Sequence, residues 1–313
     1  MDALKQRNSN SIQEQIAENK RSKKSLLITE KTIPLFLLFC AAISVLTTIG
    51  IIFTLLRESF TFFSDVSIID FFTGMHWSPW TGKFGVFPLI SGTLLVTFIA
   101  ACVALPLGVA SAIFLSEYAG ENTRKIIKPV LEVLAGIPTV VYGYFALTFV
   151  TPILMKLVPG IEIFNALSAG IVVGIMIVPM VASLSEDAMS AVPKSLREGA
   201  LALGATRLET TTKVVIPAAL SGIIASIVLA LSRAIGETMI VTIAAGASPN
   251  LTFNPAESIQ TLTAFIVQGA TGDTTYGSTI YYSIYAVGIT LFIFTFIMNL
   301  ISQYVSRKFR EDY

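Results

Sequence analysis

Charged side chains are scarce in this sequence of 313 residues, where Asp, Glu, Lys and Arg together make up 13%. A soluble domain usually carries about a quarter of such residues. Hydrophobic residues make up 54%, and the mean hydropathy is +0.75. These values exclude an ordinary cytosolic enzyme and a disordered chain. They indicate a protein that crosses a membrane several times.

Cysteine and histidine are also rare, with two cysteines and one histidine. Cys40 and Cys102 both lie in apolar runs, so there is no disulfide framework and no CxxC metal pair. A single histidine, His76, cannot build a metal site by itself. The 21 basic and 20 acidic residues almost balance, which argues against a nucleic-acid binder.

Motifs of catalysis are missing from the sequence as well. There is no G-x4-G-K-[ST] phosphate loop, and the only Gly-Lys pair, at Gly82 and Lys83, lacks that spacing. HExxH, GxSxG and DxDxDG runs are absent too. We therefore expect no enzymatic activity, no metal and no cofactor in this chain. If ATP drives its function, the hydrolysis belongs to another chain.

Six long apolar runs predict an all-α polytopic membrane protein, because a helix needs about 20 apolar residues to cross a bilayer. The runs are Ile33–Leu56, Leu89–Leu115, Val133–Met155, Ile163–Leu184, Val214–Ala245 and Tyr281–Val305. None alternates with the period of two that barrel strands show. Only the fifth run contains charges, Arg233 and Glu237.

Lys and Arg are distributed unequally over the segments that join these runs. Alternate segments hold 17 on one side and 3 on the other, which places both termini in the cytoplasm. We therefore expect a multi-pass protein of a cell membrane with both termini on the cytoplasmic side. Its parts are a cytoplasmic basic tail at 1–31, a membrane domain at 32–306 and a cytoplasmic tail at 307–313.

The cytoplasmic loop at 193–217 has helix signals that can be interpreted from local rules. Ser195 and Glu198 form an S-x-x-E capping box, which predicts a helix from Leu196. Gly204 stands where a residue of left-handed conformation ends such a helix. The loop therefore begins with a short helix that ends in a glycine turn.

A second T-x-x-E box at 206–209 predicts another helix, leading back into the membrane. On the short helix, Leu196, Ala200 and Leu203 follow a helical period and form an apolar stripe outside the bilayer. Such a stripe needs a cover. The cover is either the protein's own helix ends or a partner subunit, and periodicity alone leaves both open.

This loop resembles the EAA motif of ABC importer permeases, E-A-A-x3-G-x9-I-x-L-P. The matching positions are Glu198, Gly199, Ala200, Gly204, Val214, Val215, Ile216 and Pro217. Gly199, Val214 and Ile216 depart from the motif. The resemblance implies that the short helix, with Ser195, Leu196 and Leu203, docks into a groove of an ATPase subunit and transmits its closure.

Arg233 and Glu237 interrupt the fifth run, and a charged side chain inside a membrane is costly. Their separation of four predicts that both lie on one face of one helix. One interpretation is a self-neutralising structural pair. The other is a pathway for an anion, because the planar guanidinium suits a phosphate or sulfate oxyanion.

Three segments, at 84–100, 131–147 and 216–246, resemble the C-type permeases of the phosphate-specific Pst transport system. The resemblance covers residues from about Ile33 to Val305. It implies a type I ABC importer permease fold and phosphate import, with Arg233 and Glu237 in phosphate passage. The implied partners are an A-type permease, an extracytoplasmic phosphate-binding protein and two ATPase subunits that bind ATP and Mg. The alternatives are a permease for sulfate, molybdate or phosphonate, and a secondary transporter.

Overall fold

The computed structural model describes residues 2–308, and the side chains of residues 32–304. It divides into two units, residues 1–57 and 58–313, each of which is considered by itself. The first helix, α1 (Asp2–Asp65), contributes to both. The side chains of the tail predicted at 1–31, and residues 309–313 of the tail predicted at 307–313, lie outside the described part.

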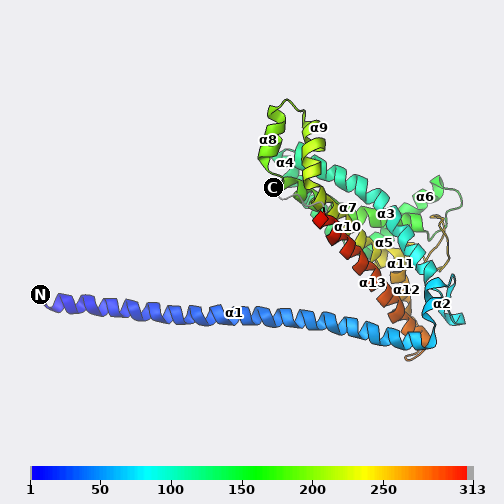
Figure 1. Cartoon of the computed structure of the whole chain (residues 1–313), viewed down its shortest axis with the longest axis horizontal. Coiled ribbons are helices and arrows are strands. Elements are labelled where there is room, and N and C mark those ends of the chain that lie inside the picture. Colours follow the sequence, from blue (N-terminus) through cyan, green and yellow to red (C-terminus); the bar gives the residue numbers. More distant parts are fainter. Residues whose placement is uncertain (1, 309–313) are drawn as a thin grey trace. The chain divides into compact units, whose positions relative to one another are not determined.

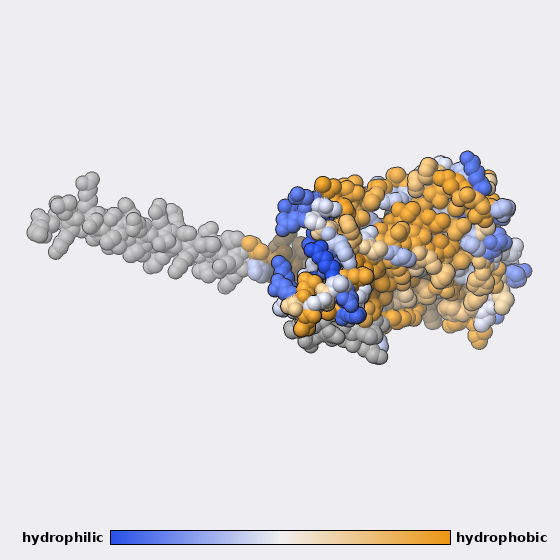
Figure 2. Space-filling view, turned by 90° about the horizontal axis from the view of Figure 1, so that it is seen from above, coloured by the Kyte–Doolittle hydropathy of each residue, from blue (hydrophilic) through white to orange (hydrophobic). Residues whose placement is uncertain are grey.

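Six helical segments are long and apolar enough to cross a membrane, which confirms the predicted number. They are Thr32–Asp65, Phe87–Tyr118, Thr139–Leu157, Ala166–Ser190, Arg207–Ile235 and Thr279–Tyr304. In the second unit, Figure 2 shows hydrophobic side chains over the middle of the body and hydrophilic ones toward its two ends. A lipid-facing belt has this distribution.

Two spans differ from their predicted bounds because the chain breaks inside the apolar run. Residues 121–136 form a separate helix, α4 (Glu121–Gly136), so the third span begins at Thr139. Ile137 is extended (φ −67°, ψ 130°) because the proline after it disfavours a helical backbone. The third span then consists of α5 (Thr139–Phe145), a π-helical turn η3 (Ala146–Val150) and α6 (Thr151–Leu157).

The fifth span is broken too. It comprises α9 (Arg207–Thr210), a π-helical turn η4 (Thr211–Val215) and α10 (Ile216–Ile235). The predicted continuation to Ala245 is wrong, since the chain breaks after Ile235 and a separate helix, α11 (Met239–Ala244), follows. Turn η4 directly precedes Pro217, whose ring cannot accept a regular α-helical register before it.

The core of the second unit lies between α3 (Phe87–Ile113) and α7 (Ala166–Ser190), which run side by side in Figure 1. Glycines allow this approach, because a Cβ at Gly170 would lie 2.6 Å from Ile99 and one at Gly174 2.8 Å from Val103. Helix α10 packs on α7 in the same way, at Gly222. Helix α13 (Thr279–Lys308) packs in turn against α10.

One end of the second unit is built from short elements. Helix α2 (Ile68–Thr73) is followed by a hairpin of strands β1 (Trp77–Ser78) and β2 (Lys83–Phe84), joined by the 3-10 turn η1 (Pro79–Thr81). Helix α12 (Leu262–Thr271) packs between α13 and α11. At the opposite end of the bundle, Figure 1 shows α8 (Lys194–Ala202) and α9 projecting beyond the other helices.

Candidate functional site

Helix α8 is the short helix that the sequence predicts in the loop at 193–217, but it starts differently. It begins at Lys194, two residues before the predicted Leu196, and Pro193 precedes it in an extended conformation (φ −56°, ψ 137°). The predicted capping box of Ser195 and Glu198 is therefore wrong: Ser195 lies inside the first turn, and no side chain caps the helix. The Glu198 side chain, released from that role, is exposed.

The C-terminal end of α8 confirms the predicted glycine turn. Gly204 has φ +88°, in the left-handed region that glycine tolerates best. Its N–H donates to the carbonyl of Leu201 at 3.0 Å, and the N–H of Ala205 donates to that of Ala200 at 3.1 Å. These are the two hydrogen bonds of a Schellman motif.

The second capping box is confirmed at the start of α9. The Thr206 hydroxyl accepts from the Glu209 N–H at 3.3 Å, and the Glu209 carboxylate accepts from the Thr206 N–H at 3.0 Å. The turn at Gly204 and this box together set the direction in which the chain returns to the membrane.

The apolar stripe on α8 has no cover among the described residues of the chain. Leu203 is 91% exposed, Leu196 is exposed as well, and no residue of α8 is buried. Ala200 is half-buried. Of the two covers that the sequence left open, packing against the protein's own helix ends is absent from the described part. This exposure favours a partner subunit.

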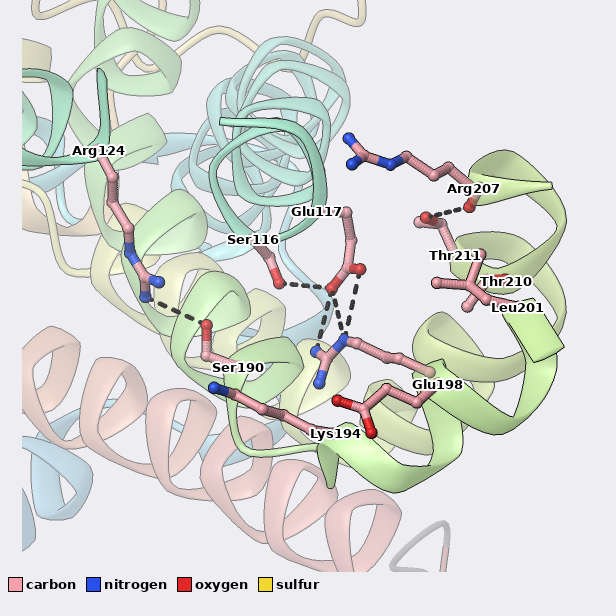
Figure 3. Close-up of a pocket in the computed structure, with 11 residues that line it drawn as sticks. Ser116, Glu117, Arg124, Ser190, Lys194, Glu198, Leu201, Arg207, Thr210 and Thr211 are labelled. Carbon is pink, nitrogen blue, oxygen red and sulfur yellow. Dashed lines mark hydrogen bonds and ion pairs between the residues drawn. The ribbon is translucent and has the colours of Figure 1, made fainter. Parts of the chain in front are cut away.

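A cavity of about 410 Å³ lies between α8, α9, the end of α7 and the end of the second span. Its lining is rich in hydroxyl and charged groups, and Figure 3 shows how they converge. The lining residues are Ser116, Glu117, Arg124, Ser190, Lys194, Arg197, Glu198, Leu201, Arg207, Thr210 and Thr211.

Arg197 anchors α8 in this region, and sequence reasoning missed it. Its guanidinium forms an ion pair with Glu117 (Nη2 to Oε1, 3.0 Å) and donates to the carbonyls of Met189 and Val192, both at 2.6 Å. Glu117 belongs to η2 (Phe114–Tyr118), a π-helical turn that continues α3. The two partners are 80 positions apart, so no local spacing could have revealed them.

A second ion cluster, also missed, joins α4 to the C-terminal end of α7. Glu186 is 1% exposed and pairs with Arg124 and with Lys128, the latter at 2.9 Å. Lys128 also contacts Asp187 at 3.0 Å. A buried carboxylate requires such partners, because an unpaired buried charge is strongly destabilising. In the sequence, the acidic pair Glu186 and Asp187 directly after the fourth apolar run could have indicated such a cluster.

We expect Glu186→Ala to lower the free energy of unfolding of the purified protein by about 1–3 kcal/mol, since it removes the acceptor for two cations. Asp187→Ala is the matched control, because the Asp187 side chain is 57% exposed and should contribute no more than about 1 kcal/mol. Thermal unfolding in detergent measures both. Equal stability of the two variants would contradict the structural role of Glu186.

Arg233 lies near the middle of the membrane-spanning part. Helices α7 and α10 run antiparallel, and the hydroxyls of Ser185 and Ser226 meet at 2.7 Å. Seven residues further along α10, or about 10 Å, Arg233 is level with Val178, halfway along α7. Arg233 is exposed, and no ion pair or hydrogen bond of the described residues involves it. A guanidinium at this depth needs water, an anion or another subunit beside it.

Glu237 does not pair with Arg233, so the predicted arrangement on one helix face is wrong. Helix α10 ends at Ile235, between the two residues, and Glu237 stands in the break before α11. Its side chain is buried at 6% exposure and accepts the N–H groups of Met239 at 3.1 Å and Ile240 at 3.2 Å. Glu237 thus caps the start of α11.

A contact from α12 also stabilises the break between α10 and α11. The Thr263 hydroxyl, on α12, donates to the backbone carbonyl of Glu237 at 2.7 Å. A polar backbone break inside a membrane is tolerated where neighbouring groups satisfy it or where it lines a cavity. Arg233 is thereby carried on the last turn of α10, exposed and without an ion pair to the buried Glu237.

Residues 104–311 match the protein family described as binding-protein-dependent transport system inner membrane component. A probable ABC transporter permease protein of Bacillus subtilis, YqgH, is 38% identical over 86% of this chain and 88% of its own length. The phosphate transport system permease protein PstC of Mesorhizobium japonicum is 36% identical over 85% of this chain and 86% of its own length.

Solved structures share the fold at low sequence identity. A bacterial alginate ABC transporter chain superimposes with a TM-score of 0.61 at 17% identity, over 86% of this chain and 94% of its own. A chain of the MetNI methionine ABC transporter gives 0.54 at 19% identity, over 75% of this chain and 100% of its own. At this level of identity the likeness concerns the fold alone.

Proposed function

Because the chain belongs to the family of binding-protein-dependent transport system inner membrane components, we propose that it is the C-type permease subunit of a bacterial importer for inorganic phosphate. Its fold is that of type I ABC importer permeases. Relatives named phosphate transport system permease protein PstC, 32–36% identical over most of their length, support phosphate as the cargo.

The observation that carries the proposal is the exposed guanidinium of Arg233 at mid-membrane depth. Phosphate crossing a bilayer needs a compensating positive charge, and arginine offers a planar fork of donors to its oxygens. The Glu237 carboxylate accepts N–H groups at the start of α11 and forms no ion pair with the Arg233 guanidinium. Arg233 is therefore free to meet an anion in a pathway between this chain and a second permease, and Glu237 acts by shaping the break.

The same proposal assigns the partners. An ABC importer permease works with ATPase subunits and a binding protein, and the uncovered stripe of α8 is the surface that we assign to an ATPase subunit. We assign the exposed side of α10 at Arg233 to an A-type permease. ATP and Mg would be bound by the two ATPase subunits, and phosphate would be delivered by an extracytoplasmic binding protein.

A permease for sulfate, molybdate or phosphonate would use the same guanidinium chemistry, so competition is the decisive test. Cells that lack their own phosphate importers and express the complete complex should take up radiolabelled phosphate. Excess unlabelled phosphate should abolish this uptake, and excess sulfate or molybdate should leave it unchanged. Suppression by sulfate or molybdate instead would assign the complex to that oxyanion.

The proposed orientation, with both termini in the cytoplasm, gives a labelling prediction. In a background without Cys40 and Cys102, an impermeant maleimide added to intact cells should label Tyr276→Cys, whose site is 80% exposed in the outer loop. It should spare Ser9→Cys and Leu203→Cys until the membrane is permeabilised. Labelling of Leu203→Cys in intact cells would place the loop at 193–217 outside the cell and contradict the proposed orientation.

A further inference from the structure

Within the described part of the chain, one side chain makes all the polar side-chain contacts of helix α8. Among the described residues, every hydrogen bond and ion pair made by a side chain of α8 belongs to Arg197. Lys194, Ser195 and Glu198 are exposed, and none of the hydrophobic clusters of the described residues includes a residue of α8. The polar contacts that fix α8 therefore come from this guanidinium, beside its packing against α9 and η4 and its two chain connections.

Arg197 contacts two different spans at once. It reaches Glu117 through Nε and Nη2, at the cytoplasmic end of the second span, and Figure 3 shows these contacts converging on the Glu117 carboxylate. It also reaches the carbonyls of Met189 and Val192, where α7 ends, and a cation is favourable beside such carbonyls. The Arg197 and Glu117 side chains are only 19% and 10% exposed.

Toward the fifth span, the chain passes through Leu203 and the Gly204 turn, both exposed, before α9 begins. Helix α8 packs there against α9 and turn η4. Toward α3 and α7, it is connected by the polar contacts of Arg197. Helices α3 and α7 form the core of the second unit, so Arg197 joins α8 to the ends of the core helices.

We infer that Arg197 is a positioning residue that makes α8, the end of α7 and turn η2 move as one rigid body when an ATPase subunit displaces α8. The inference rests on the proposed coupling role of α8. It assigns a mechanical connection to the second and fourth spans, through Glu117 and the last carbonyls of α7, in addition to the packing of α8 against α9 and η4 of the fifth span.

The distance between α8 and η2 tests this directly. Spin labels at Ala202→Cys, on α8 but off the apolar stripe, and at Tyr118→Cys, both exposed sites, are introduced into the complete complex without Cys40 and Cys102. Their separation should change by less than about 2 Å between the nucleotide-free and ATP-trapped states, the scale of shifts between packed helices. A change well above this in the otherwise wild-type complex would overturn the inference, whatever anion is transported.

Substitutions of Arg197 and Glu117 test the same connection through the coupling of ATP hydrolysis to transport. In proteoliposomes, Arg197→Gln should raise the ATP hydrolysed per phosphate imported about tenfold, corresponding to about 1.4 kcal/mol of lost coupling. Glu117→Gln should raise this ratio less, because Arg197 still donates to the carbonyls of Met189 and Val192 at the end of α7. Lys213→Gln is the matched control in the same loop, since its pair with Glu209 at 3.6 Å lies within one helical segment and leaves α8 attached.

An unchanged ratio in both Arg197→Gln and Glu117→Gln would also overturn the inference. If the complex with Arg197→Gln does not assemble, two measurements still test the inference. They are the ATP-to-phosphate ratio of Glu117→Gln and the label distance in the otherwise wild-type complex. If the complex imports no phosphate but its label distance stays constant through the nucleotide cycle, the proposed cargo fails and the inference stands.

Discussion

Replacing Arg233 with glutamine should lower phosphate uptake about 10- to 100-fold while the complex still assembles. Glutamine keeps donors of similar reach but removes the charge, and a hydrogen bond to a charged group contributes about 1.5–3 kcal/mol. Because Arg233 has no partner among the described residues, its loss leaves no buried counter-charge in this chain. Initial uptake rates, normalised to the amount of assembled complex, measure the effect.

Two variants control this result. Arg233→Lys keeps the charge without the planar fork, so its uptake should fall between those of the wild type and Arg233→Gln. Ser232→Ala removes a neighbouring hydroxyl that donates to Asn299 at 3.3 Å, and it should leave uptake near normal. Normal uptake by Arg233→Gln would mean that Arg233 serves only subunit packing.

Replacing Gly204 with proline should uncouple ATP hydrolysis from transport. Proline holds φ near −65°, whereas Gly204 has φ +88°, and proline also lacks the N–H that donates to Leu201. The turn must therefore reorganise, and α8 is presented at another angle. We expect uptake to fall about tenfold or more, since each 1.4 kcal/mol of lost coupling is tenfold, with ATP hydrolysis continuing.

Gly199→Ala is the matched control for Gly204→Pro, in the same helix. A Cβ at Gly199 would meet nothing within 4 Å, and its backbone is helical. Alanine there should stabilise α8 by about 0.5–1 kcal/mol and leave coupling intact. If Gly204→Pro imports phosphate with wild-type ATP consumption, the loop at 193–217 is not the coupling element.

Local rules predicted the features whose causes are local. The six spans follow from runs of apolar residues, the turn at Gly204 from the backbone freedom of glycine, and the second capping box from a four-residue motif. The first capping box was wrong because Pro193 already supplies the extended residue before the helix. Helix α8 therefore starts earlier, and Ser195 lies inside its first turn instead of at the capping position.

The relation of Arg233 to Glu237 was wrong for a different reason. A spacing of four places two residues on one face only if the helix is continuous, and hydropathy cannot detect a break inside an apolar run. Gly236 was the available signal, and the cap that Glu237 supplies to α11 fixes the break there. The ion pairs of Arg197 and Glu186 join positions 80 and 58–62 apart, so only the packed fold reveals them.

The central claim is that this chain, with its partners, carries phosphate across a membrane at the expense of ATP. The most direct measurement is accumulation of radiolabelled phosphate in proteoliposomes holding both permeases, the two ATPase subunits and the phosphate-loaded binding protein, with the binding protein on the side opposite the ATP. The account predicts accumulation that requires ATP and falls about 10- to 100-fold with Arg233→Gln. Accumulation without ATP, or equal rates with and without Arg233, would contradict it.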